Sequence, residues 1–111
     1  MVMDIVRTKS FDKDMLRIGA SESDVEALIS DLAANPQSGD RIEGLKGVRK
    51  IRFGLPSRNI GKRGGGRAIY LLIEIDETAI LIMAFAKNEQ SDLSPRQRKA
   101  ILSLLKDVTH G

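Results

Sequence analysis

The chain has 111 residues, which suits one domain with a single modest core and is too short for two. Hydrophobic residues make up 41% of the sequence, enough to bury a core, so wholesale disorder is excluded. There is no cysteine, which excludes disulfides, thiolate zinc sites and a cysteine nucleophile. We therefore expect residues 1–111 to form a single domain.

The formal net charge of +3 conceals an uneven distribution of charge. From Gly44 to Arg67 there are eight basic residues and no acidic one, whereas the rest of the chain holds ten basic and fifteen acidic residues. Such a separation within one domain creates a field that attracts polyanions. A solvated lysine-rich face is the simpler interpretation, but arginine, the better phosphate ligand, is the commoner of the two here. The eight residues are Lys46, Arg49, Lys50, Arg52, Arg58, Lys62, Arg63 and Arg67.

No segment has the features of a signal peptide or of a membrane span. Met1 to Ser10 alternates apolar and charged residues and lacks the hydrophobic core of a signal peptide. The longest apolar run, Ala79 to Ala86, has eight residues, whereas a membrane-spanning helix needs about 20. These features predict a cytoplasmic protein without a membrane partner.

The first third of the chain predicts a strand followed by two helices. Asp4 to Lys9 is the candidate strand, and a helix is indicated next by apolar residues at a helical spacing, Phe11, Met15 and Leu16.

The second helix has clearer signals. Ser23 followed by Glu26 has the pattern of a capping box, and Asn35-Pro36 ends the helix. Apolar residues at i, i+3, i+4 and i+7 predict its buried stripe, which consists of Val25, Leu28, Ile29 and Leu32.

Three antiparallel strands are predicted next. In Val48 to Leu55 the period-two pattern separates Lys50 and Arg52 from the face that carries Arg49, Ile51, Phe53 and Leu55. Ser57 to Gly66 holds four glycines and three basic residues, so we expect a flexible cationic loop. The apolar runs Arg67 to Ile75 and Ala79 to Lys87 predict a hairpin of interior strands, joined by the acidic turn Asp76-Glu77-Thr78.

A last helix is predicted by Ser94 with Gln97 and by Pro95 at the first helical position. Its expected inner stripe is Ile101, Leu104, Leu105 and Val108. The predicted fold is therefore α+β: an antiparallel sheet of about four strands, with two N-terminal helices and a C-terminal helix. We expect the helices to pack on one face of the sheet and the other face to carry function.

Several familiar sites are excluded by the sequence. The stretch from Gly54 to Arg63 resembles a phosphate-binding P-loop, but six residues instead of four separate Gly54 from Gly61, and Arg63 replaces the Ser or Thr that binds magnesium. The only histidine, His110, is the penultimate residue, where a frayed tail is expected. We expect no metal and no cofactor, and a solvated hairpin turn accounts for the acidic residues Glu74, Asp76 and Glu77.

The basic residues of the predicted strands form the main candidate site. If the strands that carry Lys50, Arg52 and Arg67 pair antiparallel, the three side chains converge near the glycine-rich loop. Three cations around one phosphate would bind RNA, and they would stabilise the charge that develops when a ribose 2′-hydroxyl attacks its own phosphodiester. That reaction needs neither a metal nor an activated water. Binding without cleavage is the alternative, and composition alone does not separate the two.

A second candidate group is Lys87-Asn88-Glu89-Gln90, four polar residues that directly follow a buried strand. In one interpretation they lead into the last helix, and in the other they extend the basic surface.

The aromatic residues predict how RNA would be contacted. All four lie in apolar patterns that indicate core packing, which argues against reading of bases by stacking on a sheet. Binding should therefore depend on phosphates and weaken steeply with salt. The four are Phe11, Phe53, Tyr70 and Phe85.

Three segments carry a family resemblance: Gly44 to Arg52, Gly61 to Tyr70, and Ala84 to Glu89 with Asp92-Leu93-Ser94. In this order they resemble the RelE/HigB toxins of bacterial type II toxin–antitoxin systems, and the HigB-like branch most. Further agreement in order and spacing comes from Thr8-Lys9-Ser10-Phe11 and from Asn35-Pro36 followed by Gly39, so the likeness covers nearly the whole chain.

The resemblance implies an endoribonuclease that cleaves mRNA in the ribosomal A site during translation. It also implies contact with ribosomal RNA and neutralisation by a cognate antitoxin, often a helix-turn-helix DNA-binding protein. The alternative is a noncatalytic member of the same superfamily, either a gyrase poison or an RNA-binding module.

Position by position, the resemblance assigns phosphate handling to Lys50, Arg52 and Arg67 and places Lys87 in the matching segment after the last strand. Asn88 and Ser94 depart from RelE, which has an arginine and a tyrosine there. Proton transfer is thereby left open between Glu89 and Lys50. The predicted catalytic residues are Lys50, Arg52, Arg67, Lys87 and Glu89, and the predicted RNA-binding residues are Arg49, Arg58, Lys62, Arg63 and Asn88.

Overall fold

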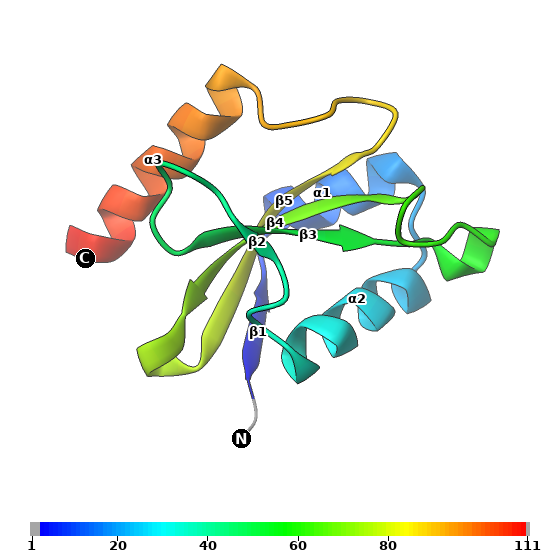
Figure 1. The fold of residues 1–111 in the computed structure, drawn as a ribbon, viewed down its shortest axis with the longest axis horizontal. Coiled ribbons are helices and arrows are strands. Elements are labelled where there is room, and N and C mark those ends of the chain that lie inside the picture. Colours follow the sequence, from blue (N-terminus) through cyan, green and yellow to red (C-terminus); the bar gives the residue numbers. More distant parts are fainter. Residues whose placement is uncertain (1–2, 111) are drawn as a thin grey trace.

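The described part of the chain forms a five-stranded sheet with helices on both faces (Figure 1). The computed structural model describes the backbone of residues 3–110 and the side chains of residues 3–108. In chain order the elements are β1 (Asp4–Arg7), α1 (Lys9–Ile18), α2 (Glu22–Ala34), β2 (Asp40–Arg41), β3 (Val48–Phe53), β4 (Gly66–Ile73), β5 (Thr78–Ala86) and α3 (Pro95–His110), with short 3-10 helices at Pro56–Arg58 and Glu74–Asp76.

The sheet has the strand order β1-β5-β4-β3-β2. β2 through β5 pair antiparallel, whereas β1 runs parallel to β5, because two helices carry the chain away from β1 before the remaining strands form. The α+β class is confirmed. The expected all-antiparallel sheet of about four strands is in fact a mixed sheet of five, since β2 is a two-residue strand with no sequence signal.

Alternation along the strands produces two cores on opposite faces of the sheet. One core contains Phe11 of α1, Leu32 of α2 and Tyr70 of β4, and the other contains Ile101 of α3 and Ile69 of β4. Figure 1 shows α3 on its own, apart from α1 and α2. The expectation that all helices share one face is therefore wrong, and the second face is partly covered by α3.

Two details of the N-terminal helices differ from the sequence prediction. The capping box of α2 is made by Ser21 and Asp24, not by Ser23 and Glu26, because the helix begins two residues earlier than predicted. On α1, Phe11 is buried but Leu16 is 77% exposed, because five residues of helix turn Leu16 away from the sheet.

Other predicted boundaries shift by one or two residues. Leu55 lies beyond β3 but stays buried and forms an isolated bridge with Ile60, which gives the cationic loop some structure. Ile75 falls in the 3-10 turn and is 93% exposed. The predicted start of the last helix at Ser94 and Gln97 is confirmed, and the two residues form a capping box there. Val108 at the far end of the predicted stripe is 42% exposed. The side chain of His110 lies outside the described residues.

The predicted core role of the four aromatic residues is confirmed, since each is at most 2% exposed. Tyr70 has an additional role: its hydroxyl donates to the carbonyl of Pro36 at 2.6 Å and accepts from the amide of Gly39 at 3.1 Å. The turn after α2 is thereby fastened to the centre of the sheet. None of the helices in the described part of the chain combines the length and the hydropathy that a membrane crossing requires.

Candidate nucleic-acid interface

Three basic side chains share the face of the sheet that α3 covers in part. In the β3–β4 register Arg52 is opposite Arg67 and Lys50 is opposite Ile69. The side chains on this face become more exposed along β3: Val48 is buried, Lys50 is half-buried and Arg52 is exposed. α3 thus covers one end of the face and leaves Lys50, Arg52 and Arg67, called here the cationic face, at the open end.

Arg52 and Arg67 are positively charged residues that lie directly opposite each other on the neighbouring strands β3 and β4. Residues in such positions have Cβ atoms about 4.5–5.5 Å apart, so the charges repel each other. Burial lowers the pKa of Arg67, and the positive charge of Arg52 lowers it further. Arg67 donates from Nη1 to the carbonyl of Gly66 at 3.0 Å, which leaves further donors of its guanidinium for a ligand. An anion between the two side chains would relieve this repulsion.

Lys50 has an acidic neighbour that the sequence did not indicate. Its Nζ lies 3.6 Å from Oδ1 of Asp92, on the segment that connects β5 to α3. The backbone amide of Leu93 lowers the pKa of Asp92, and the positive charge of Lys50 lowers it further. Asp92 therefore carries negative charge at the border of the cationic face.

Lys87 and Asn88 lie at the same end of the sheet as Arg67. Ala86 is opposite Gly66 in the β4–β5 register, and the amide of Lys87 donates to the carbonyl of Gly65 at 3.1 Å. Lys87 and Asn88 are exposed and border a hollow of about 350 Å³, which Arg58 and Ile18 of α1 also line. The strand end therefore brings Lys87 and Asn88 close to the basic loop.

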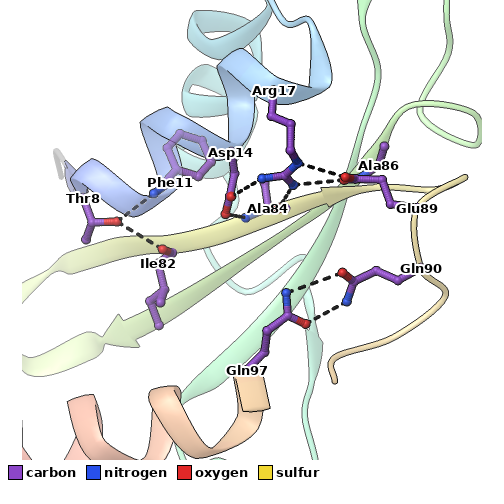
Figure 2. Close-up of polar contacts among 10 residues, drawn as sticks. All are labelled: Thr8, Phe11, Asp14, Arg17, Ile82, Ala84, Ala86, Glu89, Gln90 and Gln97. Atoms are coloured by element: carbon purple, nitrogen blue, oxygen red, sulfur yellow. Dashed lines mark hydrogen bonds and ion pairs between the residues drawn. The ribbon is translucent and has the colours of Figure 1, made fainter. Parts of the chain in front are cut away.

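Glu89 has a different environment from the other predicted catalytic residues. Its carboxylate pairs with the guanidinium of Arg17 on α1, and its Oε1 accepts the amide of Ala86 (Figure 2). Hydrogen bonding from Arg17 and from the amide of Ala86 lowers the pKa of Glu89. Both carboxylate oxygens are thus engaged at the edge of β5.

The predicted RNA-binding residues are dispersed. Arg49 lies on the opposite face of β3 from Lys50, and its Nη1 donates to the carbonyls of Gln37 and Gly39 at 3.1 and 2.7 Å. Lys62 forms a 3.0 Å ion pair with Asp31 of α2. Arg58 donates to the carbonyl of Ile18 at 3.4 Å, and Arg63 is exposed in the loop before β4.

The glycine run before Arg67 has a packing role. A Cβ on Gly65 would lie 2.1 Å from the carbonyl oxygen of Phe53, and one on Gly66 would lie 2.6 Å from that of Phe85. Real Cβ atoms do not come so close to backbone oxygens, so these positions require glycine. The glycines allow the backbone at the start of β4 to lie close to the backbones of β3 and β5. This close packing fixes the position of Arg67, which directly follows.

The arrangement can bind a phosphate chain through fixed cations. Within the described residues, no three His, Asp or Glu side chains gather as they would around a metal ion. The roles predicted for the individual residues of this interface stay predictions.

No family model matches the chain. Solved structures of RelE proteins do resemble it. The isolated RelE toxin of Escherichia coli is 12% identical, with 92% of this chain and 98% of that chain covered and a TM-score of 0.57. A mutant of the same toxin with two arginines replaced by alanine is 14% identical over 81% and 88% of the two chains, with a TM-score of 0.52.

A chain of the RelBE2 toxin–antitoxin complex from Mycobacterium tuberculosis is 15% identical. The match covers 78% of this chain and 99% of that chain, with a TM-score of 0.55. Matches at this low identity show that the fold is shared, but they do not show a shared activity. The assignment to the HigB-like branch stays a prediction. The chain has the RelE-like fold.

Proposed function

We propose that the protein is a toxin of a type II toxin–antitoxin system, an endoribonuclease that needs no metal and cleaves mRNA in the A site of the ribosome. The observation that carries this proposal is the cationic face, where Arg52 and Arg67 oppose each other with Lys50 beside them at the uncovered end of the sheet. Cleavage stops translation, and a cognate antitoxin of the helix-turn-helix class neutralises the toxin. Both events take place in the cytoplasm.

The proposed reaction is an internal transesterification of RNA. The 2′-oxygen attacks the adjacent phosphorus and loses its proton, and the bond from phosphorus to the 5′-oxygen breaks as that oxygen gains a proton. The products are a 2′,3′-cyclic phosphate and a 5′-hydroxyl. Arg52 and Arg67 stabilise the charge that develops on the phosphoryl oxygens. Lys50 is the candidate for proton transfer on this face, because the carboxylate of Glu89 is paired with Arg17.

Two features support the proposed partners. The separation of charge within the chain favours a polyanionic partner such as ribosomal RNA and its bound message. The RelBE2 match is a toxin–antitoxin complex, and a protein of the same fold in complex with its antitoxin supports an antitoxin partner here.

The test is cleavage of mRNA in a translating bacterial extract. Purified protein, treated with a chelator and freed from it before mixing, is expected to produce cuts phased with the codons, mapped by primer extension. Lys50→Ala and Arg67→Ala are expected to abolish the cuts, whereas Lys13→Ala on α1 removes an exposed positive charge and leaves them intact. Messages that stay whole while translation continues would refute the enzymatic proposal.

Noncatalytic RNA binding is the second candidate, and one observation favours it. Glu89, the predicted carboxylate base, has both oxygens engaged by Arg17 and the amide of Ala86. A protein that protects mRNA in the A site from digestion without cutting it would support this candidate. Induction of the gene that causes a DNA-damage response, with protein synthesis intact, would instead indicate a gyrase poison.

A further inference from the structure

Among the described residues 3–110, no strand pairs with the outer side of one half of β5. β1 pairs with β5 only from Thr78 to Leu81, and β5 continues to Ala86. Unpaired backbone groups at a sheet edge need partners, and they also invite pairing with other chains. In this protein side chains supply the partners.

The partners come from Thr8, which precedes α1, from α1 itself and from the segment after β5. Thr8 donates from its hydroxyl to the carbonyls of Leu81 and Ile82 at 2.8 and 3.1 Å. At Ala84, the amide donates to Oδ2 of Asp14 at 3.0 Å and the carbonyl accepts from Arg17 at 3.3 Å. At the last residue of the strand, the amide of Ala86 donates to Oε1 of Glu89 at 2.6 Å.

Arg17 joins these side chains into one unit. Its Nε and Nη2 donate to the two carboxylate oxygens of Glu89 at 2.9 and 3.0 Å, and its Nη1 donates to Asp14 (Figure 2). Bidentate pairs of this kind fix orientation as well as adding energy. The three residues form the Asp14–Arg17–Glu89 clasp, which occupies the position that a continued β1 would have.

The clasp adjoins the turn that carries Lys87 and Asn88, because Glu89 is the residue after Asn88. The amide of Glu89 donates to the carbonyl of Ala86 at 3.0 Å and closes the turn. On the other side the amide of Lys87 donates to Gly65, next to the start of β4. The turn is therefore held from both sides, and Arg67 is separated from Gly65 by one residue.

We propose that Arg17 and Glu89 are positioning residues, which hold Lys87 and Asn88 at the end of the sheet where β4 and the cationic face begin, and take no proton in the reaction. The role in catalysis rests on the proposed function. An ion pair this exposed contributes little stability by itself, so its main effect is on geometry. A base must reach the proton that it takes, and three hydrogen bonds from Arg17 and from the amide of Ala86 hold the carboxylate of Glu89 at the outer edge of β5.

Hydrogen exchange of the Ala86 amide tests the clasp without reference to RNA. In the wild-type protein this amide is expected to be protected. In Glu89→Ala its protection should fall by about tenfold or more, while Glu89→Gln, which keeps the Oε1 acceptor, restores most of it. Glu26→Gln on an exposed position of α2 is the matched control. An Ala86 amide that exchanges in the wild type as fast as an unstructured one would overturn the clasp.

Cleavage kinetics on programmed ribosomes test the positioning role. Loss of a general base costs about 10² to 10⁴ in rate, and Gln replaces a base no better than Ala does. If Glu89 is a positioning residue, Glu89→Gln should keep the cleavage rate within about fivefold of the wild type, with an unchanged pH profile. Glu89→Ala and Arg17→Ala should lower the cleavage rate by about tenfold or more, because a misplaced contact group slows the reaction.

The double variant Arg17→Ala with Glu89→Ala is expected to be no slower than either single one, because each change removes the same contact. Lys13→Ala on the same helix controls for loss of charge. A Glu89→Gln variant as inactive as Glu89→Ala, with the fold intact, would overturn the proposal. If wild-type protein cuts no RNA, the proposed function fails, whereas the exchange experiment still decides the clasp.

Discussion

Arg52 on β3 and Arg67 on β4 are direct cross-strand partners on the partly open face of the sheet. Like charges in this position destabilise a sheet, and here no acidic residue lies between Gly44 and Arg67 to compensate them along the chain. Natural proteins accept such local conflicts mainly at functional sites. The pair is therefore the clearest indication that this face receives an anion.

Removal of one charge from the pair should stabilise the protein. Arg52→Gln is expected to raise the free energy of unfolding by about 0.2–1 kcal/mol, because the repulsion with Arg67 is removed. The urea midpoint at low salt measures this change. Arg63→Gln removes the same charge from the preceding loop and should leave the midpoint nearly unchanged. An Arg52→Gln variant that is less stable than Arg63→Gln would contradict this reading of the pair.

The salt dependence of RNA binding should report which cations contact phosphate. For a single strand, log Kd changes with log salt by about 0.7 per neutralised phosphate. Arg67→Gln is expected to reduce the slope by about 0.7, measured by fluorescence anisotropy with a labelled RNA oligonucleotide. Arg49→Gln should change the slope less, because Arg49 lies on the other face and donates to Gln37 and Gly39. Equal effects of the two substitutions would refute the assignment of the interface to the α3 side.

Asp24 should make stability depend on pH in the acid range. Burial raises the pKa of Asp24, but hydrogen bonds from Ser57 and Ser21 outweigh this effect and bring the pKa to about 2. A lowered pKa means that the native state binds fewer protons than the unfolded chain. The stabilisation is thus complete above about pH 4 and is lost as pH falls towards 2.

The variant Asp24→Asn checks this expectation. At pH 7 it should lower the free energy of unfolding by about 1–3 kcal/mol, because its amide cannot accept all the bonds that Ser21 and Ser57 donate. Between pH 4 and 2 its stability should change less than that of the wild type. Parallel curves for the two proteins, measured by urea unfolding, would exclude Asp24 as a source of the dependence.

Tyr70→Phe should destabilise the fold without altering the cationic face. The hydroxyl of Tyr70 is buried, and its loss leaves the carbonyl of Pro36 and the amide of Gly39 without this partner. We expect the free energy of unfolding to fall by about 1–3 kcal/mol, with an unchanged urea m-value. RNA affinity of the folded protein should stay the same, which separates a stability effect from a binding effect.

The sequence by itself determined most of the elements and the main basic surface. Period-two alternation assigned Lys50 and Arg52 to one face of a strand, and this assignment is independent of the rest of the fold. Helical spacing identified the buried residues Phe11, Leu32 and Ile101 of the three helices, because apolar periodicity is a local signal.

Tertiary structure decided which partners these residues meet. The register that sets Arg52 against Arg67, the pairing of Glu89 with Arg17 and the approach of Asp92 to Lys50 join segments far apart in the chain. A local pattern carries no information about such pairs, because strand register and helix placement follow from packing of the whole core. The same holds for α3, whose periodicity predicts a helix but not the face of the sheet that it covers.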